Sequence, residues 1–373
     1  MRVEPTLAEA IERGSTLPAD WYTDPGVLAH EHERIFRRAW QYVSPLERVS
    51  RPGDFVTARL GEVPVVVCRD ERGTLRAFAN VCRHRGAEVV LDACGNRRSL
   101  QCHYHAWTYG LDGRLRAAPR ANEQDGFDKS ELSLHALPVE AWGPFVFVNP
   151  DPDAAAFADA LGELPRLVAA AGLELERLRP RDHAEYEIAA NWKVVVDNYL
   201  ECYHCPVAHP SFTDLIDLDD YELVEYPTFS IQQGRLREDA KRGVPYTVRP
   251  GVDAGFYAFL WPNFTLNVYP GPGNVSVNLF VPLGEHRTRA RFEYFFVDEV
   301  RDEDVREFVD FIDVVQREDT VLCESVQRGL RSGFFDQGQL MLSREHGLRH
   351  FARLVCRSLV DGGSSGARAS PTR

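Results

Sequence analysis

Two short segments of the sequence each pair a cysteine with a histidine. Cys82 and His84 are separated by one residue, Cys102 and His105 by two, and seventeen residues lie between the two segments. Four such side chains can share a metal site only if both segments reach the same point in space. The sequence therefore predicts two neighbouring loops that are carried by one small, rigid framework.

Two kinds of metal site use two thiolates and two imidazoles. In a Rieske [2Fe-2S] centre the thiolates hold one iron and the imidazoles hold the other. Zinc also accepts two cysteines and two histidines. The single residue between Cys82 and His84 is a shorter gap than zinc sites usually have, and Gly86, Trp107 and Gly110 fit the two loops of a Rieske centre. The pattern therefore favours an iron–sulfur cluster over zinc.

A second set of potential ligands lies near the middle of the chain. On a regular helix Asp197, Glu201 and His204 would project from one side. His209 would point elsewhere, but Pro206 removes an amide donor, and a break in the helix can bring His209 beside His204. Two histidines and one carboxylate on one side of a metal leave positions open for O2 on non-haem Fe(II). The alternative is a group of ordinary polar residues on a helix.

The carboxylate that completes this second site is expected on a long helix predicted over residues 301–330. Asp319 lies near the centre of its apolar face on a helical wheel, whereas Asp313 and Glu318 point away. A carboxylate on a buried face needs a cation or a donor beside it, so Asp319 is the predicted third ligand. The alternative is a buried salt bridge. The apolar face is formed by Phe308, Ile312, Val315, Leu322 and Val326.

Composition limits the class of protein and its partners. An apolar content of 44% and 11% aromatic residues predict a globular chain. A net charge of -13 argues against nucleic acid as a partner and favours a cationic one. No apolar run resembles a signal peptide or could span a membrane, so a cytoplasmic location is expected. The six cysteines outside the cluster motif are expected to be reduced, packed thiols: Cys68, Cys94, Cys202, Cys205, Cys323 and Cys356. Cys202 and Cys205 have a C-x2-C spacing, which is also typical of zinc or redox sites.

The sequence divides into four parts. Residues 1–40 are predicted to form a helical arm that packs on the catalytic domain, and residues 41–150 a domain of short strands. Residues 151–360 combine helices with strands, and the alternation over 289–294 predicts one buried sheet face. Residues 361–373 form a polar tail that is predicted to be disordered. The fold class is α+β, with a small all-β domain and a helix-capped antiparallel-sheet domain.

Together these motifs resemble the catalytic α subunits of Rieske non-haem iron oxygenases, in the aromatic-ring-hydroxylating dioxygenase family. The resemblance runs from about Trp21 to Leu359, on Cys82-Arg83-His84-Arg85-Gly86, Cys102-His103-Tyr104-His105-Ala106-Trp107, Asn191-Trp192-Lys193 and Glu201-x2-His204-x4-His209. Within the family the chain is most similar to the branch of choline, glycine betaine and carnitine oxygenases. Glu201 stands where many dioxygenases have Asp, and Glu318-Asp319 and the run Ser325-Val326-Gln327-Arg328-Gly329-Leu330 also fit this branch.

The resemblance implies the terminal oxygenase component of a multi-protein system. The electron-accepting cluster would be held by Cys82, His84, Cys102 and His105. The Fe(II) at which O2 meets a small-molecule substrate would be held by His204, His209 and Asp319. In this family electrons cross between neighbouring subunits, so a homotrimer is expected, in which Glu201 joins His204 to a cluster histidine, His105, of the adjacent chain. A separate flavin and iron–sulfur reductase would supply electrons from NAD(P)H.

Three functions follow from these features. The favoured one is monooxygenation that hydroxylates or N-dealkylates a small molecule; the second is ring hydroxylation of an aromatic compound by a dioxygenase. The third, a Rieske electron carrier without oxygenase turnover, leaves the second histidine set unexplained. A nitrogen-bearing cation could be held by aromatic faces near the pocket, although aromatic side chains in strands more often form plain core. The candidates are Phe256, Tyr257, Phe259, Trp261 and Tyr269.

Overall fold

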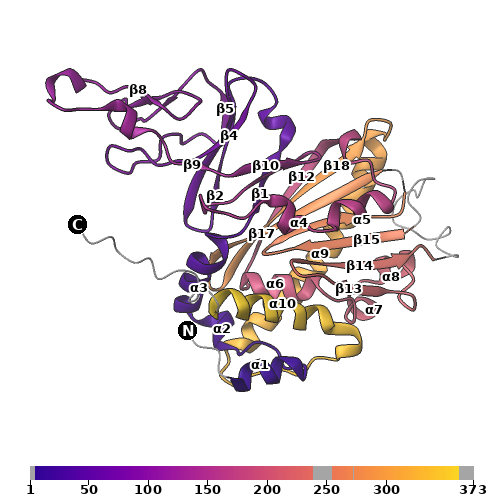
Figure 1. Cartoon of the computed structure of the whole chain (residues 1–373). Coiled ribbons are helices and arrows are strands. Elements are labelled where there is room, and N and C mark those ends of the chain that lie inside the picture. Colours follow the sequence, from indigo (N-terminus) through magenta and orange to yellow (C-terminus); the bar gives the residue numbers. More distant parts are fainter. Residues whose placement is uncertain (1–4, 238–253, 272, 361–373) are drawn as a thin grey trace.

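The computed structural model describes residues 5–237, 254–271 and 273–360. Figure 1 shows a small β domain at one end, a large sheet at the other, and helices along the lower edge. The predicted combination of a small all-β domain with a helix-capped antiparallel sheet is confirmed. The polar tail predicted to be disordered, 361–373, lies outside the described residues.

The N-terminal arm is helical. It consists of α1 (Pro5–Glu12), α2 (Asp20–Thr23), α3 (Pro25–Glu31) and one π-helical turn (His32–Phe36). The side chain of Asp24 accepts from the backbone N–H of Gly26, and proline at the first helical position needs no N–H partner, so α3 begins there. The arm shares one apolar core with the large sheet and its helices, through Ile11, Leu17, Trp21, Tyr22, Val27, Leu28, Ile35 and Phe36.

The small β domain contains three antiparallel sheets. A five-stranded sheet has the order β5-β2-β3-β4-β9, and three-stranded sheets have the orders β1-β11-β10 and β6-β7-β8. Short hairpins connect most neighbours, so this part of the chain needs no helix to cross over a sheet. The strands are β1 (Gln41–Pro45), β2 (Asp54–Leu60), β3 (Val63–Arg69), β4 (Leu75–Ala79), β5 (Cys94–Asn96), β6 (Leu100–Gln101), β7 (Thr108–Tyr109), β8 (Leu115–Ala117), β9 (Ala136–Leu137), β10 (Val139–Trp142) and β11 (Phe145–Val148).

The rest of the chain is built around a seven-stranded antiparallel sheet of order β12-β18-β17-β16-β15-β14-β13. Its strands are β12 (Leu178–Ile188), β13 (Glu222–Glu225), β14 (Phe229–Arg235), β15 (Ala254–Leu260), β16 (Phe264–Val268), β17 (Asn274–Gly284) and β18 (Arg287–Val297). The helices around it are α4 (Phe157–Leu161), α5 (Leu164–Ala170), α6 (Trp192–Tyr199), α7 (Cys205–Ala208), α8 (Pro210–Leu215), α9 (Asp302–Leu330) and α10 (Leu342–Val360).

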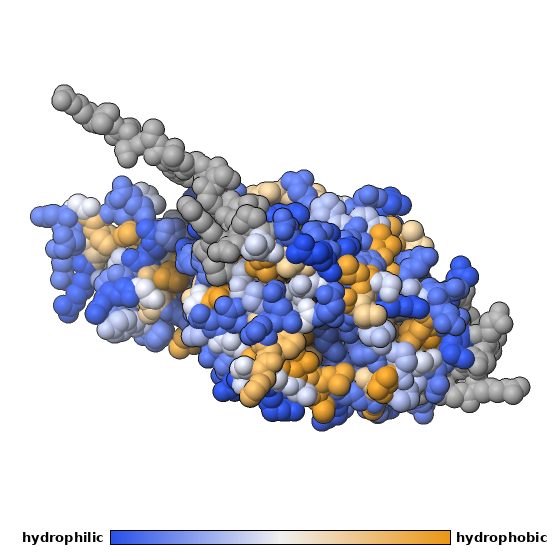
Figure 2. Space-filling model, turned by 90° about the horizontal axis from the view of Figure 1, so that it is seen from below, coloured by the Kyte–Doolittle hydropathy of each residue, from blue (hydrophilic) through white to orange (hydrophobic). Residues whose placement is uncertain are grey.

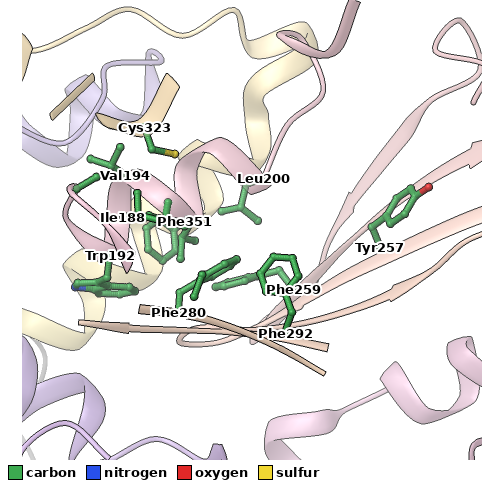
Figure 3. Close-up of a cluster of buried hydrophobic side chains, with 14 of the residues drawn as sticks. Ile188, Trp192, Val194, Leu200, Tyr257, Phe259, Phe280, Phe292, Cys323 and Phe351 are labelled. Carbon is green, nitrogen blue, oxygen red and sulfur yellow. The ribbon is translucent and has the colours of Figure 1, made fainter. Parts of the chain in front are cut away.

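This sheet is covered on both faces, so the prediction of a single buried face was wrong. On one face Phe292 and Tyr294 pack in the core that includes helices α6, α9 and α10. Figure 3 shows Phe280 and Phe292 standing on the sheet toward Trp192 and Phe351 of the helices. On the other face Phe295 packs in a second core, with residues of α4, α5, β1 and β11. The small β domain thus buries the sheet face that the alternation had suggested was exposed.

Within the described ranges, no helix, not even the 29 residues of α9, combines the length and apolar character needed to cross a bilayer.

Candidate metal centres

The two Cys-x-His and Cys-x2-His segments form two loops with the same backbone turn. The N–H of Gly86 donates to the carbonyl of Cys82 at 3.0 Å, and the N–H of Ala106 donates to the carbonyl of Cys102 at 3.0 Å. Gly86 and Ala106 both adopt positive φ angles, of 75° and 57°. A tight left-handed turn after each cysteine therefore folds each loop back, so that its histidine lies near its cysteine.

The loops place two thiols inside and two imidazoles outside. Cys82 and Cys102 are 3% and 2% exposed, whereas His84 and His105 are exposed, with ring centroids 4.6 Å apart. His84 stacks on Trp107 at a centroid distance of 4.8 Å. This donor set fits a Rieske [2Fe-2S] cluster, in which thiolates hold the inner iron and imidazoles hold the outer one.

Tyr109 also belongs to this centre, although its role was not predicted from the sequence. The hydroxyl of Tyr109 lies 3.3 Å from the Cys82 Sγ and accepts a hydrogen bond from the N–H of Arg83 at 3.0 Å. Burial raises the pKa of the Cys102 thiol, while the backbone N–H groups of Tyr104 and His105 act in the opposite direction. Donors aimed at sulfur tune the potential of a cluster. Only the place of Tyr109 on β7, directly after the second loop, could have suggested this contact.

The helix that leads to the second centre ends earlier than predicted. Helix α6 begins where Asn191 accepts from the N–H of Lys193 at 3.0 Å, and it ends at Tyr199. Glu201 instead accepts hydrogen bonds from the N–H groups of Tyr203 and His204, a local bond that competes with the helix. The prediction that one helix stripe carries Asp197, Glu201 and His204 was therefore wrong.

Asp197 does not belong to this centre. Its carboxylate accepts from the hydroxyl of Tyr22 in the N-terminal arm at 2.7 Å. Burial raises the pKa of Asp197 to about 7, and the hydrogen bond from Tyr22 acts in the opposite direction. The residue therefore ties the arm to helix α6.

His204, His209 and Asp319 meet at one point between helices α7 and α9. The Nε2 atoms of the two histidines are 3.1 Å apart, and Oδ1 of Asp319 lies 2.9 Å from Nε2 of His209 and 3.5 Å from Nε2 of His204. One ligand atom from each lies within 4.8 Å of the others. Pro210 starts a new helix directly after His209, which turns this side chain back toward His204. The group fits a facial two-histidine, one-carboxylate iron site.

Each imidazole is held from behind by a second carboxylate. Glu201 Oε1 forms a short hydrogen bond with Nδ1 of His204, and Glu318 Oε2 lies 2.8 Å from Nδ1 of His209. These bonds fix the protons on Nδ1 and leave both Nε2 atoms free for a metal. The prediction that Glu318 points away was wrong, because its side chain reaches His209 from the flank of α9.

The electrostatics of this centre match a cation at its middle. Burial disfavours the protonated form of His204, but hydrogen bonds with Asp319 and Glu201 outweigh it and raise its pKa to about 10. Burial acts to raise the pKa of Asp319, yet the imidazoles of His204 and His209 beside it lower that pKa overall. Metal ions compete with protons for such ligands, so iron affinity should fall as the pH falls.

The buried side of α9 differs from the predicted one. Val326 is 52% exposed, whereas Gln316 and Gln327 are buried. Gln327 accepts from the N–H of Asn191 at 2.7 Å, which secures the start of α6. The buried face predicted from apolar periodicity is rotated by part of a turn from the observed one, because these two buried positions are polar.

Cys202 and Cys205 flank His204 and form a disulfide, so the prediction that both are reduced thiols was wrong. Their Cα atoms are 5.0 Å apart, which is within the range that a disulfide can bridge. The end of α6 at Tyr199 makes this possible, because the following loop brings the two sulfurs together. The four other cysteines outside the cluster motif are free.

A cavity of about 100 Å³ adjoins the three converging side chains. Tyr257 and Tyr269 line it, with ring centroids 5.2 Å apart. The other three aromatic candidates pack elsewhere: Phe256 in the core on the opposite face, Phe259 against Phe351, and Trp261 against Trp192 and Phe351. Polar side chains also reach the cavity, from Asn198, Gln232, Asn267, Asn278 and Gln316.

A small β domain with a two-cysteine, two-histidine site, joined to a sheet domain with a buried two-histidine, one-carboxylate site, defines an iron-dependent oxygenase with its own electron-accepting cluster. Comparison with known proteins supports this class. Residues 39–137 match the Rieske [2Fe-2S] domain, and residues 175–360 match the catalytic domain of the ring-hydroxylating α subunit.

Similar proteins include choline and carnitine oxygenases. Choline monooxygenase from Arabidopsis thaliana is 38% identical over 94% of this chain and 84% of its own length. The carnitine monooxygenase oxygenase subunit of Acinetobacter pittii is 35% identical over 91% of this chain and 94% of its own. The chain belongs to the Rieske non-haem iron oxygenases, as an oxygenase α subunit. It is therefore an oxidoreductase with a Rieske cluster and a mononuclear iron, and not an electron carrier.

Solved structures give the same answer for the fold. A quaternary ammonium Rieske monooxygenase, described in terms of carnitine oxidation and inter-subunit electron transfer, superposes with a TM-score of 0.87 at 32% identity, over 96% of this chain and 99% of the other. Naphthalene 1,2-dioxygenase from Rhodococcus sp. superposes with a TM-score of 0.80 at 20% identity, with the same coverage, and shows the fold alone.

Proposed function

We propose that this oxygenase hydroxylates a carbon next to the nitrogen of a small quaternary ammonium compound. The hydroxylated product then collapses, releasing an aldehyde and a tertiary amine. One oxygen atom of O2 enters the product, and the other leaves as water after two electrons and two protons are supplied. The oxygenase would thus act as a monooxygenase, in line with the choline and carnitine monooxygenases it resembles.

The cavity beside His204, His209 and Asp319 carries this proposal. Its volume of about 100 Å³ is smaller than the engineered cavity of about 150 Å³ that holds benzene. A small aliphatic compound suits such a space better than a fused ring system. Aromatic faces attract quaternary ammonium groups, and Tyr257 and Tyr269 present rings at 68° to each other in the cavity wall. Two carboxylates, Glu201 and Asp319, also line it.

In this proposal His204, His209 and Asp319 hold the mononuclear iron. When bound, the iron supplies open positions for O2 and electrons for its activation. The protein contributes the rest: Glu201 and Glu318 orient the two imidazoles, and the aromatic wall keeps water from the substrate. Cys82, His84, Cys102 and His105 hold the cluster, with residues 41–150 as its domain and residues 151–360 as the catalytic domain.

Glu201 is proposed as the bridge for electrons. Its carboxylate holds His204 and lines both the 100 Å³ cavity and a second cavity of about 590 Å³ on the other side of His204. Within one chain, the strands β6 to β8 that carry the second cluster loop lie far from α7 (Figure 1). We infer that the cluster loops of a neighbouring copy enter the larger cavity, so that Glu201 joins His204 to the partner subunit's His105.

This route requires a closed ring of subunits, and we propose a homotrimer. Exposed apolar side chains lie around the larger cavity or in the segment that leads to it: Val321 at 65% exposure, Val326 at 52%, Phe334 at 98%, Phe335 at 38% and Met341 at 52%. Apolar groups are also visible on the lower face of the molecule in Figure 2. Groups of this kind mark protein–protein contacts.

Electrons are proposed to come from NAD(P)H through a separate flavin and iron–sulfur reductase, and the enzyme is proposed to be cytoplasmic. Residues 41–150 contain 14 Lys and Arg against 13 Asp and Glu, whereas the chain as a whole has a net charge of -13. The cluster domain therefore repels an acidic electron donor less than the rest of the chain taken together.

Product analysis across a small panel tests the proposed function. The purified oxygenase, a surrogate reductase and NADH are supplied with choline, carnitine, glycine betaine, stachydrine and substituted aromatic compounds. Aldehyde release coupled to O2 uptake is expected with at least one of the quaternary ammonium compounds. Oxygen insertion into the aromatic compounds alone would instead assign ring hydroxylation.

A further inference from the structure

The cavity at the iron centre has an unusual wall for the middle of a sheet. Three neutral amides from separate strands reach it: Gln232 from β14, Asn267 from β16 and Asn278 from β17. They are only 2%, 2% and 7% exposed. A buried amide is unfavourable unless its donors and acceptors find partners, so each of these three requires a physical reason to be there.

Two of the three amides are satisfied within the protein. Asn267 accepts from the hydroxyl of Tyr199 at 2.6 Å, and its amide donates to Ser276 Oγ at 3.2 Å. Gln232 donates to the carbonyl of Tyr199 at 2.7 Å and accepts from Tyr221 at 3.3 Å. Both therefore hold Tyr199 and the end of helix α6 against the sheet, which is a structural role.

Asn278 is different. Its carbonyl oxygen Oδ1 is buried and has no hydrogen-bond partner in the described part of the chain. In the sheet Asn278 is paired with Thr265 of β16 and Phe292 of β18. Side chains of paired residues, and of residues two apart on a strand, project to the same face. Asn278 therefore projects with Phe292 and Phe280 toward helix α6, the direction seen for those two rings in Figure 3.

The surroundings of Asn278 leave the cavity as the source of its partner. Phe280 and Phe292 line the same cavity beside it and offer no donor. A buried acceptor without a partner destabilises the protein, and a ligand that brings a hydrogen-bond donor removes that destabilisation. Recognition of this kind is selective, because a ligand without the donor leaves the acceptor unpaired in the complex as well.

We propose that Asn278 binds the substrate directly and selects compounds that carry a hydrogen-bond donor, such as a hydroxyl, away from the oxidised carbon. The chemical nature of this donor rests on the proposed function. A quaternary nitrogen has no N–H, so in that substrate class the donor is the hydroxyl of an alcohol. Asn278 then favours a choline-like amino alcohol over a compound whose polar end only accepts hydrogen bonds.

Matched substrate pairs test this inference. Choline is compared with propyltrimethylammonium, in which a methyl group replaces the hydroxyl without a change in length, and benzyl alcohol is compared with ethylbenzene. For each compound, binding is measured by calorimetry, and KM and kcat by O2 uptake with product analysis. In the wild type the alcohol of the pair that is turned over should bind at least about tenfold more tightly than its partner.

Two variants identify the residue responsible. Asn278→Leu, similar in size but without an amide, should reduce the preference to less than about threefold by weakening binding of the alcohol. Ser230→Ala is the control, because Ser230 Oγ is also buried without a partner in the described residues and lies on the same sheet, outside the cavity lining. It should keep the full preference.

The possible outcomes separate this inference from the proposed function. Turnover of benzyl alcohol over ethylbenzene, without any quaternary ammonium turnover, would reject the proposed substrate class and retain the role of Asn278. Equal binding within the pair that is turned over, an undiminished preference in Asn278→Leu, or no binding of either pair would overturn that role. A wild-type preference for glycine betaine over choline that disappears in Asn278→Leu would also overturn it, since the amide would then act as a donor.

Discussion

The two metal centres are built in opposite ways. The cluster site takes its four side chains from two short loops of one β domain, and its imidazoles face the surface. The iron site takes its side chains from separate elements, with Asp319 lying 110 residues after His209, and His209 is only 2% exposed. Exposure suits a centre that exchanges electrons with other proteins, whereas burial suits a centre that must control O2 and substrate.

The difference extends to the groups that support the ligands. At the cluster, a tyrosine hydroxyl and backbone N–H groups point toward sulfur. At the iron site, full carboxylates stand behind both histidines. Neutral donors tune a potential, while carboxylates orient imidazoles and increase their affinity for a metal. The two centres should therefore respond independently to mutation, and each of the following predictions tests that independence.

The largest effect is expected from loss of the iron carboxylate. Asp319→Ala should abolish turnover to less than about a thousandth of the wild type, because two histidines alone do not retain iron. The cluster should be unaffected, so the visible spectrum and the reduced Rieske EPR signal should remain. Thr320→Ala, one residue along α9, is a control outside the ligand set. Activity near the wild-type level in Asp319→Ala would move the ligand role to another acid.

The contrast between the centres also explains what the sequence could reveal. The convergence of the four side chains of the cluster motif was predictable because local loops fix their spacing. His204 and His209 were proposed as partners because a break near Pro206 was foreseen, but the real end of α6 at Tyr199 depends on Glu201 bonding to its own loop. The position of this helix end depends on contacts that no sequence pattern shows, and so does the contact that Glu318 makes from α9 with His209.

The polar residues of the cores were the hardest to foresee. Lys193 is fully buried and pairs with the equally buried Glu31 of the arm at 2.6 Å. Nothing in the periodicity of either segment indicates this partner, because the two residues are far apart in sequence. The same holds for Gln327, whose polar character at a buried position is explained only by its neighbour in space, Asn191.

A smaller effect is expected where the two centres communicate. Glu201→Gln removes the carboxylate behind His204 but no proposed ligand, so in excess Fe(II) it should hold both metals while electron transfer between them slows by about 100-fold. A single-turnover experiment with a reduced cluster, O2 and substrate measures this rate. Glu318→Gln provides the matched comparison, because it changes the carboxylate behind His209, which lies outside the proposed electron route. Wild-type cluster oxidation in Glu201→Gln would remove the bridging role.

Glu318→Gln itself should weaken the iron site alone. The lost carboxylate orients His209, so iron affinity is expected to fall by about 10- to 100-fold. Competition with a chelator, followed by iron analysis, measures this change. The affinity of both forms should decrease from pH 8 to pH 6, since protons compete for the histidines. If Glu318→Gln and the wild type had the same iron affinity at every pH, the contact between Glu318 and His209 would have no role in holding the metal.

The smallest effect is expected at the cluster. Tyr109→Phe removes the hydroxyl beside the Cys82 sulfur and should lower the reduction potential by a few tens of millivolts, because the reduced cluster loses a donor. Voltammetry on the purified protein measures the shift. Iron content at the mononuclear site should not change. A potential equal to that of the wild type would show that the 3.3 Å contact is not a tuning hydrogen bond.

One chain should hold two separate iron centres, and metal analysis of the purified protein distinguishes this arrangement from a single centre. The purified protein should contain three iron ions and two acid-labile sulfides per chain, and Asp319→Ala should contain two iron ions with the sulfide unchanged. Two iron ions per chain in the fully loaded wild type, or zinc in place of iron at either site, would show that the chain does not hold both iron centres.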